Sequence, residues 1–394
     1  MKTINYLLIA AVLPAVSVGI QAGPQDQSLT VTKSVSPDQQ SAASSFWTAE
    51  RIATAKPFPM PIDYGSSDVD IEAIQADAGD LGQPGMTPPG RGQANPGGAA
   101  EMSFTDELQS LTDEADDGDT PDVEGVLQGA GMDVTFQAGA LGTPADLMAG
   151  TTQVYTSYLV NSKSALWKVY PHKWVGRLSF RTPSGTSYCS ATAISNNNIV
   201  TAAHCVYDTT NNRFYSNWVF SPAYRNGTNP YGTFRATACT VLTAWINLTG
   251  SFSINTWSRH DVAVCSVGPN ASLQTLNQAV GWAGRTWGNS YTQLHFNSGY
   301  PWNDYRNIAL TDGAGQYLRN CTAESFTQTT ETLGSGCNWG PGISGGSWLT
   351  GYKALEVTGW VNSVNSGLFI NTQNLYGARF NTSNIVPLCT ARGC

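Results

Sequence analysis

The clearest pattern in the chain begins at Trp174, where short apolar runs start to alternate with turn-forming residues. Val175, Leu178 and Phe180 lie in the first run, and Tyr188–Ile194 forms the second. Clusters of Asn, Gly, Ser and Pro separate such runs up to the end of the chain, and no helical apolar period continues long enough for a large helix. The pattern predicts an all-β domain of about 220 residues, built as a sandwich or as paired barrels.

The region before this domain has a different composition. Residues 24–150 contain 21 acidic and 4 basic side chains, whereas residues 151–394 contain 7 acidic and 15 basic ones. Apart from a short helix expected within residues 48–57, the first region is rich in Gly, Asp, Pro and Ala and lacks the material for a large core. We expect residues 23–160 to be a largely disordered acidic propeptide or linker, and residues 161–394 to form the β domain.

The N-terminus resembles a secretory signal peptide. Lys2 supplies a positive charge, an apolar run extends over Tyr6–Val18, and small residues follow up to a possible cleavage point at Ala22. A membrane anchor needs about 20 apolar residues, and this run is shorter and contains a proline. Residues 1–22 are therefore predicted to be a signal peptide, and the protein is predicted to be secreted and extracellular, without a membrane association.

Cysteine usage agrees with an oxidising compartment. The number of cysteines is even, which favours disulfides over free thiols in a secreted chain. They lie at Cys189, Cys205, Cys239, Cys265, Cys321, Cys337, Cys389 and Cys394. No pair has the CxxC spacing of a metal site and the chain has only four histidines, so we expect no metal and no cofactor. Spacing alone leaves the pairing of the cysteines open.

Three local motifs have the residues that hydrolytic serine chemistry requires. His204 follows an apolar strand and precedes a cysteine, Asp261 opens another apolar strand, and Ser344 lies in the glycine-rich loop Gly342–Ser347. Such chemistry needs a nucleophile, a base, and a carboxylate that orients the base. The backbone N–H groups of Gly342 and Ser344 are suited to stabilise a developing oxyanion.

Each motif also has a simpler interpretation. A lone histidine is commonly a core residue bonded to the backbone, an aspartate commonly ends a strand, and a serine between glycines commonly forms a turn. For all three to occur in this order by accident is improbable. The sequence therefore favours a catalytic triad of His204, Asp261 and Ser344.

The same motifs resemble a known family. Thr201–Cys205, Asp261–Val264 and Gly342–Gly346 are similar to the signature stretches of the chymotrypsin/trypsin family, and the resemblance covers residues 174–385. Gly281-Trp282-Ala283 and Gly299-Tyr300-Pro301 are similar to its secreted microbial branch, which includes glutamyl endopeptidases.

The resemblance implies a fold of two six-stranded antiparallel β-barrels and cleavage of peptide bonds in protein or peptide substrates through an acyl-enzyme. In that mechanism His204 would be the base and acid, Asp261 its orienting partner, and Ser344 the nucleophile. Gly342 and Ser344 would form the oxyanion hole. We expect a monomer, with its own propeptide as a partner.

The resemblance also implies a disulfide pairing. Cys189 and Cys205 match the family's bridge beside the histidine. Of the remaining cysteines, we expect Cys239–Cys265 beside the aspartate strand, Cys321–Cys337 before the nucleophile, and Cys389–Cys394 near the C-terminus.

The chain departs from the family pattern at two places. Ile343 precedes the nucleophile, where trypsin-like zymogens have an aspartate that receives the new N-terminal amine on activation. We therefore expect activation without a buried N-terminal ion pair. Aligned with the family, Asn338, Val361 and Asn362 fall in the primary substrate pocket. Neither the segment around Asn338 nor the one around Val361 and Asn362 has a clear charge. This favours a neutral or apolar side chain at the cleaved residue and does not support glutamate specificity.

Two rival functions remain from the sequence. The loop also fits the G-x-S-x-G elbow of esterases, but that fold needs a histidine after the serine, and none follows Ser344. The other rival is a catalytically silent binding protein on a protease scaffold, such as an adhesin or toxin component. Nucleic-acid binding is disfavoured because no Lys/Arg cluster interleaves with aromatic residues.

Overall fold

The computed structural model describes residues 28–65, 83–92, 154–160, 165–311, 313–353, 356–370 and 372–394. The predicted signal peptide lies outside these ranges. Among the described residues, none of the helices is long and apolar enough to cross a membrane.

Six antiparallel strands close into the first barrel in the order β6-β7-β8-β13-β12-β11, and β11 returns to β6. They are β6 (Val175–Thr182), β7 (Gly185–Ile194), β8 (Asn198–Thr201), β11 (Ser216–Pro222), β12 (Phe234–Leu242) and β13 (Ala263–Val267). The apolar run that opened the sequence pattern supplies the interior, because Leu178 and Phe180 are fully buried. Burial of such side chains is the main source of the barrel's stability.

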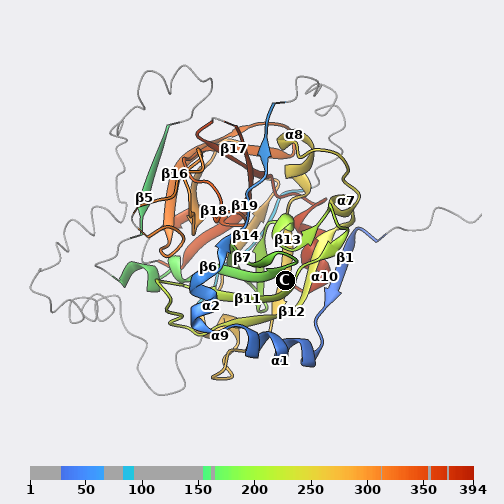
Figure 1. Ribbon diagram of the computed structural model, residues 1–394. Helices are drawn as coiled ribbons and strands as arrows, with labels where there is room; N and C mark the ends of the chain where they lie inside the picture. Colours follow the sequence, from blue (N-terminus) through green and yellow to red (C-terminus); the bar gives the residue numbers. More distant parts are fainter. Residues whose placement is uncertain are drawn as a thin grey trace, which may run out of the picture.

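Six further antiparallel strands close into the second barrel in the order β18-β15-β16-β17-β20-β19, and β19 pairs back with β18. They are β15 (Leu294–Gly299), β16 (Arg319–Thr327), β17 (Thr332–Gly336), β18 (Ser347–Lys353), β19 (Thr358–Phe369) and β20 (Asn374–Ala378). The two-barrel fold expected from the sequence is therefore present, with the second barrel in orange and red in Figure 1.

Short elements cover the ends of the barrels. Two short strands, β9 and β10, pair with each other, and β14 runs parallel to β19. These elements are β9 (Tyr207–Asp208), β10 (Arg213–Phe214), β14 (Gly284–Trp287), α7 (Thr243–Ile246), α8 (Ile254–Trp257), α9 (Leu276–Val280), α10 (Ile385–Arg392) and the 3₁₀ helices η1 (Ala165–Lys168), η2 (His172–Trp174), η3 (Ala203–Cys205) and η4 (Ser258–His260).

Parts of the expected propeptide region fold onto the barrels. This region contributes β1 (Thr30–Ser34), α1 (Pro37–Phe46), α2 (Ala49–Thr54), β2 (Lys56–Pro57), β3 (Ile62–Asp63), β4 (Gly85–Thr87) and β5 (Tyr155–Leu159). Helix α2 is the short helix expected from the sequence, and the Thr48 side chain caps it. β1 pairs with β12, β2 with β7, β3 with β19, β4 with β14 and β5 with β16. Figure 1 shows α1 and β1 in blue against the first barrel.

The acidic composition of this region therefore did not prevent parts of it from folding onto the barrels. Residues 28–65 contain Trp47 and Ile52, both buried, within a small hydrophobic cluster that also contains Val219 and Tyr224, which lie in or directly after strand β11. Burial of these apolar side chains offsets the entropy cost of ordering the segment.

Candidate active site

His204 is held at the end of a core strand. It lies in η3, directly after β8, and both neighbours Ala203 and Cys205 are fully buried. The disulfide Cys189–Cys205 ties this turn to strand β7. The 3₁₀ turn and the disulfide together fix the backbone from which the imidazole projects.

Asp261 is the partner of this imidazole. The carboxylate is fully buried and accepts hydrogen bonds from His204 N at 2.8 Å, from His204 Nδ1 at 2.7 Å and from the Ser366 hydroxyl at 2.6 Å. Three donors offset the cost of removing a carboxylate from water. Since an ionised carboxylate only accepts, Nδ1 is the donor of this bond, and in a neutral imidazole Nε2 then keeps its lone pair.

The other three histidines are weak bases near neutral pH. Burial lowers the pKa of His172, His260 and His295 to about 4 in each case. None of them makes an ion pair with a carboxylate among the described residues. His204 is thus the histidine of this chain that is placed for acid–base chemistry.

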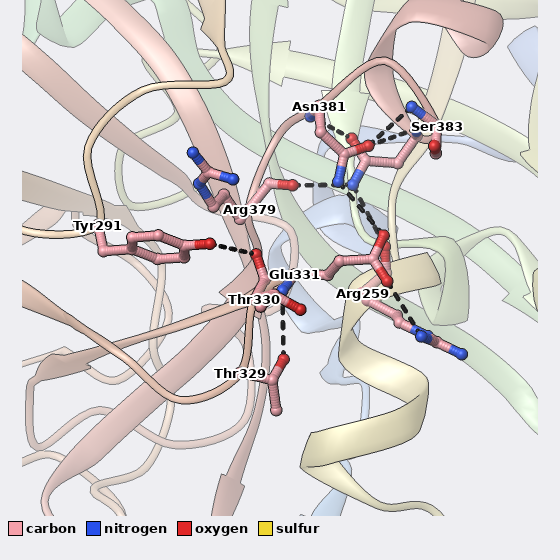
Figure 2. Close-up of polar contacts among 9 residues, drawn as sticks. Arg259, Tyr291, Thr329, Thr330, Glu331, Arg379, Asn381 and Ser383 are labelled. Carbon is pink, nitrogen blue, oxygen red and sulfur yellow. Dashed lines mark hydrogen bonds and ion pairs between the residues drawn. The ribbon is translucent and has the colours of Figure 1, made fainter. Parts of the chain in front are cut away.

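A polar network braces the segment that leads to Asp261 (Figure 2). Arg259 Nη1 lies 3.0 Å from Glu331 Oε2, and Asn381 donates to Glu331 Oε1 at 3.4 Å. Arg379 N donates to the backbone oxygen of Glu331 at 2.8 Å, and the Asn384 side chain donates to the backbone oxygen of Arg259 at 3.4 Å. Because Glu331 lies immediately before β17, the network connects the aspartate segment to the second barrel.

The loop Gly342–Ser347 needs its glycines. Gly342 has φ +99° and Gly345 has φ +76°, a region that other residues avoid. A Cβ on Gly342 would lie 2.5 Å from Tyr300 O, and one on Gly345 would lie 2.1 Å from Thr201 Oγ1. The glycines therefore permit both the loop conformation and its close approach to the histidine strand.

Asn365 holds the loop from the other side. Gly345 N donates to Asn365 O at 2.8 Å, and Asn365 N donates to Gly346 O at 2.9 Å. Its side-chain amide donates to Ile343 O at 3.4 Å and accepts from Trp348 Nε1 at 2.6 Å. These bonds fix the backbone on both sides of Ser344.

The loop packs directly against the histidine segment. Ser190 N donates to Ser344 O at 2.8 Å, and a Cβ on Gly345 would lie 2.8 Å from Ala202 N. The Ser344 hydroxyl and His204 Nε2 are both buried, and neither has a hydrogen-bond partner in the described part of the chain. A hydroxyl and an unpaired imidazole nitrogen are thus left on adjoining segments, and such pairs commonly tighten only when substrate binds.

Comparison with protein families decides the affiliation of this fold and site. The family model described as Trypsin matches residues 167–376. The chain belongs to the trypsin family. That match contains His204, Asp261 and Ser344, and it ends within strand β20.

Solved structures of proteases are also similar to this trypsin-family chain. Protease Anisep from Arthrobacter nicotinovorans is 27% identical and covers 56% of this chain and 96% of its own, with a TM-score of 0.47. A thermostable serine protease, AL20, from an extremophilic microorganism is 26% identical. It covers 56% of this chain and 96% of its own, with the same TM-score of 0.47. A Glu endopeptidase in complex with MPD is 18% identical and covers 62% of this chain and 99% of its own, with a TM-score of 0.47. No curated protein sequence matches this chain.

The disulfides of this trypsin-family chain use all eight cysteines. They are Cys189–Cys205, Cys239–Cys265, Cys321–Cys337 and Cys389–Cys394, the four pairs expected from the sequence. One group of possible metal ligands lies close together in the described residues, formed by Cys189, His204 and Cys205. Both cysteines are bridged, so this group does not fit a metal ion.

Two of the expected pocket residues, Val361 and Asn362, lie on strand β19. Val361 is fully buried in the core cluster, and the Asn362 side chain donates to Gln293 Oε1 at 3.1 Å. On the same strand, Ser366 donates to the Asp261 carboxylate at 2.6 Å. Asn338 is half-buried, and its backbone oxygen accepts a hydrogen bond from Tyr305 N at 2.9 Å.

Sequence reasoning missed Ser366 and Asn365. Strand β19 contains four Ser or Asn residues among twelve, and all have similar local surroundings in the sequence. The available signal was the order of the strands. Strand β18 continues from the Ser344 loop, and β19, which contains Asn365 and Ser366, follows β18 in the chain and pairs with it.

Proposed function

We propose that this trypsin-family protein is a secreted serine endopeptidase that cleaves protein or peptide substrates through an acyl-enzyme. The single observation that carries the proposal is the triple donation to Asp261, which orients the His204 ring with Nδ1 toward the carboxylate. Extracellular location, a monomeric form and a propeptide as intramolecular partner are parts of the same proposal, and they rest on the sequence.

The residues suggest the following steps. Ser344 Oγ attacks the carbonyl carbon of the scissile bond while His204 Nε2 takes the hydroxyl proton. The imidazolium formed is stabilised by Asp261 and returns the proton to the leaving amine. The N–H groups of Gly342 and Ser344 would donate to the oxyanion. Water then attacks the acyl-enzyme, with His204 again as base, and releases Ser344.

Casein hydrolysis separates this proposal from that of a silent binding protein. We expect the purified protein, once it has reached its active form, to digest casein, and a fluorophosphonate to stop the digestion by reacting with the activated serine. A metal chelator serves as the control and should leave the activity unchanged. A folded protein that neither digests casein nor reacts with the fluorophosphonate would favour the binding function instead.

Activation without a buried N-terminal ion pair is part of the proposal. Ile343 is fully buried within an apolar cluster, where an ammonium group would be desolvated without a counter-charge. We therefore expect that one or two extra residues before the N-terminus of the processed enzyme leave kcat/KM within about threefold of the parent, because Ile343 offers that amine no carboxylate to pair with. Complete loss of activity in the extended forms, with unchanged thermal stability, would contradict this mode of activation.

A further inference from the structure

The segment Lys56–Asp63, here called the strap, joins the two barrels across the candidate site. At one end Lys56 and Pro57 pair with β7, and Phe58 N donates to Tyr188 O at 2.8 Å. At the other end the strap runs parallel to β19, where Leu368 N donates to Pro61 O at 3.2 Å and Ile370 N donates to Asp63 O at 2.9 Å.

The middle of the strap covers the triad. The Phe58 ring stacks over His204, with ring centroids 6.1 Å apart and an angle of 24° between the planes. The same ring packs against Phe180 and Tyr215 of the first barrel. Next to Ser366, a Cβ on Gly367 would lie 2.7 Å from Pro61 O. Ser344 has no exposed surface in this arrangement, and His204 is 6% exposed.

Met60 lies in an apolar pocket beside the nucleophile. Its side chain is 4% exposed and belongs to the same buried cluster as Ile343, which precedes Ser344, and Leu368, which follows Ser366 by two residues. The other buried members of the cluster are Cys321, Leu333, Cys337, Trp339, Trp348 and Leu375. A pocket bounded by the neighbours of both Ser344 and Ser366 is placed to receive the side chain of the residue that is cleaved.

We propose that the strap is a built-in occupant of the substrate cleft, and that the pocket of Met60 is the primary specificity pocket, selective for unbranched or γ-branched apolar side chains such as Met and Leu. The inference rests on the proposed function and names its substrate class. An apolar lining favours such side chains by the area they bury, and a charged side chain would be desolvated there without a partner.

The composition of the strap suits an occupant that is not consumed. Prolines at Pro57, Pro59 and Pro61 alternate with the other residues, so the bonds that follow Phe58 and Met60 are tertiary amides of proline. Proline restricts the backbone and removes the N–H, and its ring crowds the nitrogen that must be protonated as the leaving group. A stiff, extended segment also loses little entropy when it docks.

The test uses the full chain with Met60→Asp, which places a charge in the pocket, and Phe58→Ala, which removes the ring over His204. Met86→Asp is the control, because Met86 is 63% exposed on β4. We expect both strap variants to react with a fluorophosphonate at Ser344 at least about tenfold faster than wild type does, because opening the strap raises the fraction of molecules whose site is accessible. The Met86→Asp chain should react at the wild-type rate. Thermal unfolding of each variant verifies that it is folded.

A peptide-library digest with the Phe58→Ala chain then reads the pocket. Cleavage mainly after Met and Leu supports the assignment, whereas a dominant acidic or basic preference overturns it. Wild type reacting as fast as the folded strap variants would overturn occlusion while leaving the proposed endopeptidase intact. Folded strap variants that fail to react at all would overturn the endopeptidase proposal itself.

Discussion

Ser344→Ala is expected to lower kcat for casein or peptide hydrolysis by about 10⁴-fold or more, since removing one member of a cooperating triad removes most of its effect. The substitution deletes the hydroxyl that lies buried and unpartnered beside the histidine segment. The loop itself should persist, because its position depends on the glycines and on the backbone bonds of Asn365. The measurement is steady-state kinetics, made in the wild-type and Phe58→Ala backgrounds so that the strap does not mask the effect.

Ser363→Ala is the matched control for this prediction. Ser363 is also a fully buried serine of the second barrel whose hydroxyl has no partner among the described residues, and the donors to Asp261 in that part of the chain are His204 and Ser366 instead. We expect its activity to stay near that of the parent enzyme. If Ser344→Ala retained activity close to that of Ser363→Ala, another residue would have to be the nucleophile.

Asp261→Asn is expected to reduce kcat by about 10³- to 10⁴-fold with little change in overall fold, because the amide has nearly the same shape but the wrong hydrogen-bonding pattern. The carboxylate accepts from both His204 N and His204 Nδ1. An amide offers one oxygen and one NH₂ in their place, which favours the tautomer with the proton on Nε2. Such an imidazole cannot take the proton of Ser344.

Ser366→Ala is expected to lower kcat less than Asp261→Asn does. It removes one of the three donors to Asp261 and leaves both bonds from His204 in place. The loss of one hydrogen bond to a buried charge is about 1–3 kcal/mol, so we expect a loss of about tenfold in kcat. The account would be contradicted if Ser366→Ala were as damaging as Asp261→Asn, because the orientation of His204 would then not depend mainly on the carboxylate.

The sequence predicted the parts of the site that carry local signals. His204 and Ser344 lie in short motifs whose residue types are constrained by backbone geometry, and Asp261 opens an apolar strand where a carboxylate needs a partner. Gly345 shows the constraint most clearly, since a side chain there would overlap Thr201. The two-barrel architecture followed from short alternating strands together with the resemblance carried by these motifs.

Long-range packing accounts for what the sequence did not predict. Ser366 is one of several similar polar residues on β19, and only the strand register determines which of them faces Asp261. Phe58 and Met60 lie in a proline-rich stretch within an acidic region, where local composition indicates a linker. On either side of them, Lys56–Pro57 pairs with β7 and Ile62–Asp63 pairs with β19. These pairings connect residues far apart in the chain, and no local pattern encodes them.

The most direct test of the account is to locate a fluorophosphonate adduct by mass spectrometry of the Phe58→Ala chain and of the same chain carrying His204→Ala. The account predicts a single adduct on the peptide that contains Ser344, formed rapidly in the first protein and at a strongly reduced rate in the second. An adduct on a different serine, or a rate that does not depend on His204, would contradict the claim that Asp261, His204 and Ser344 act together.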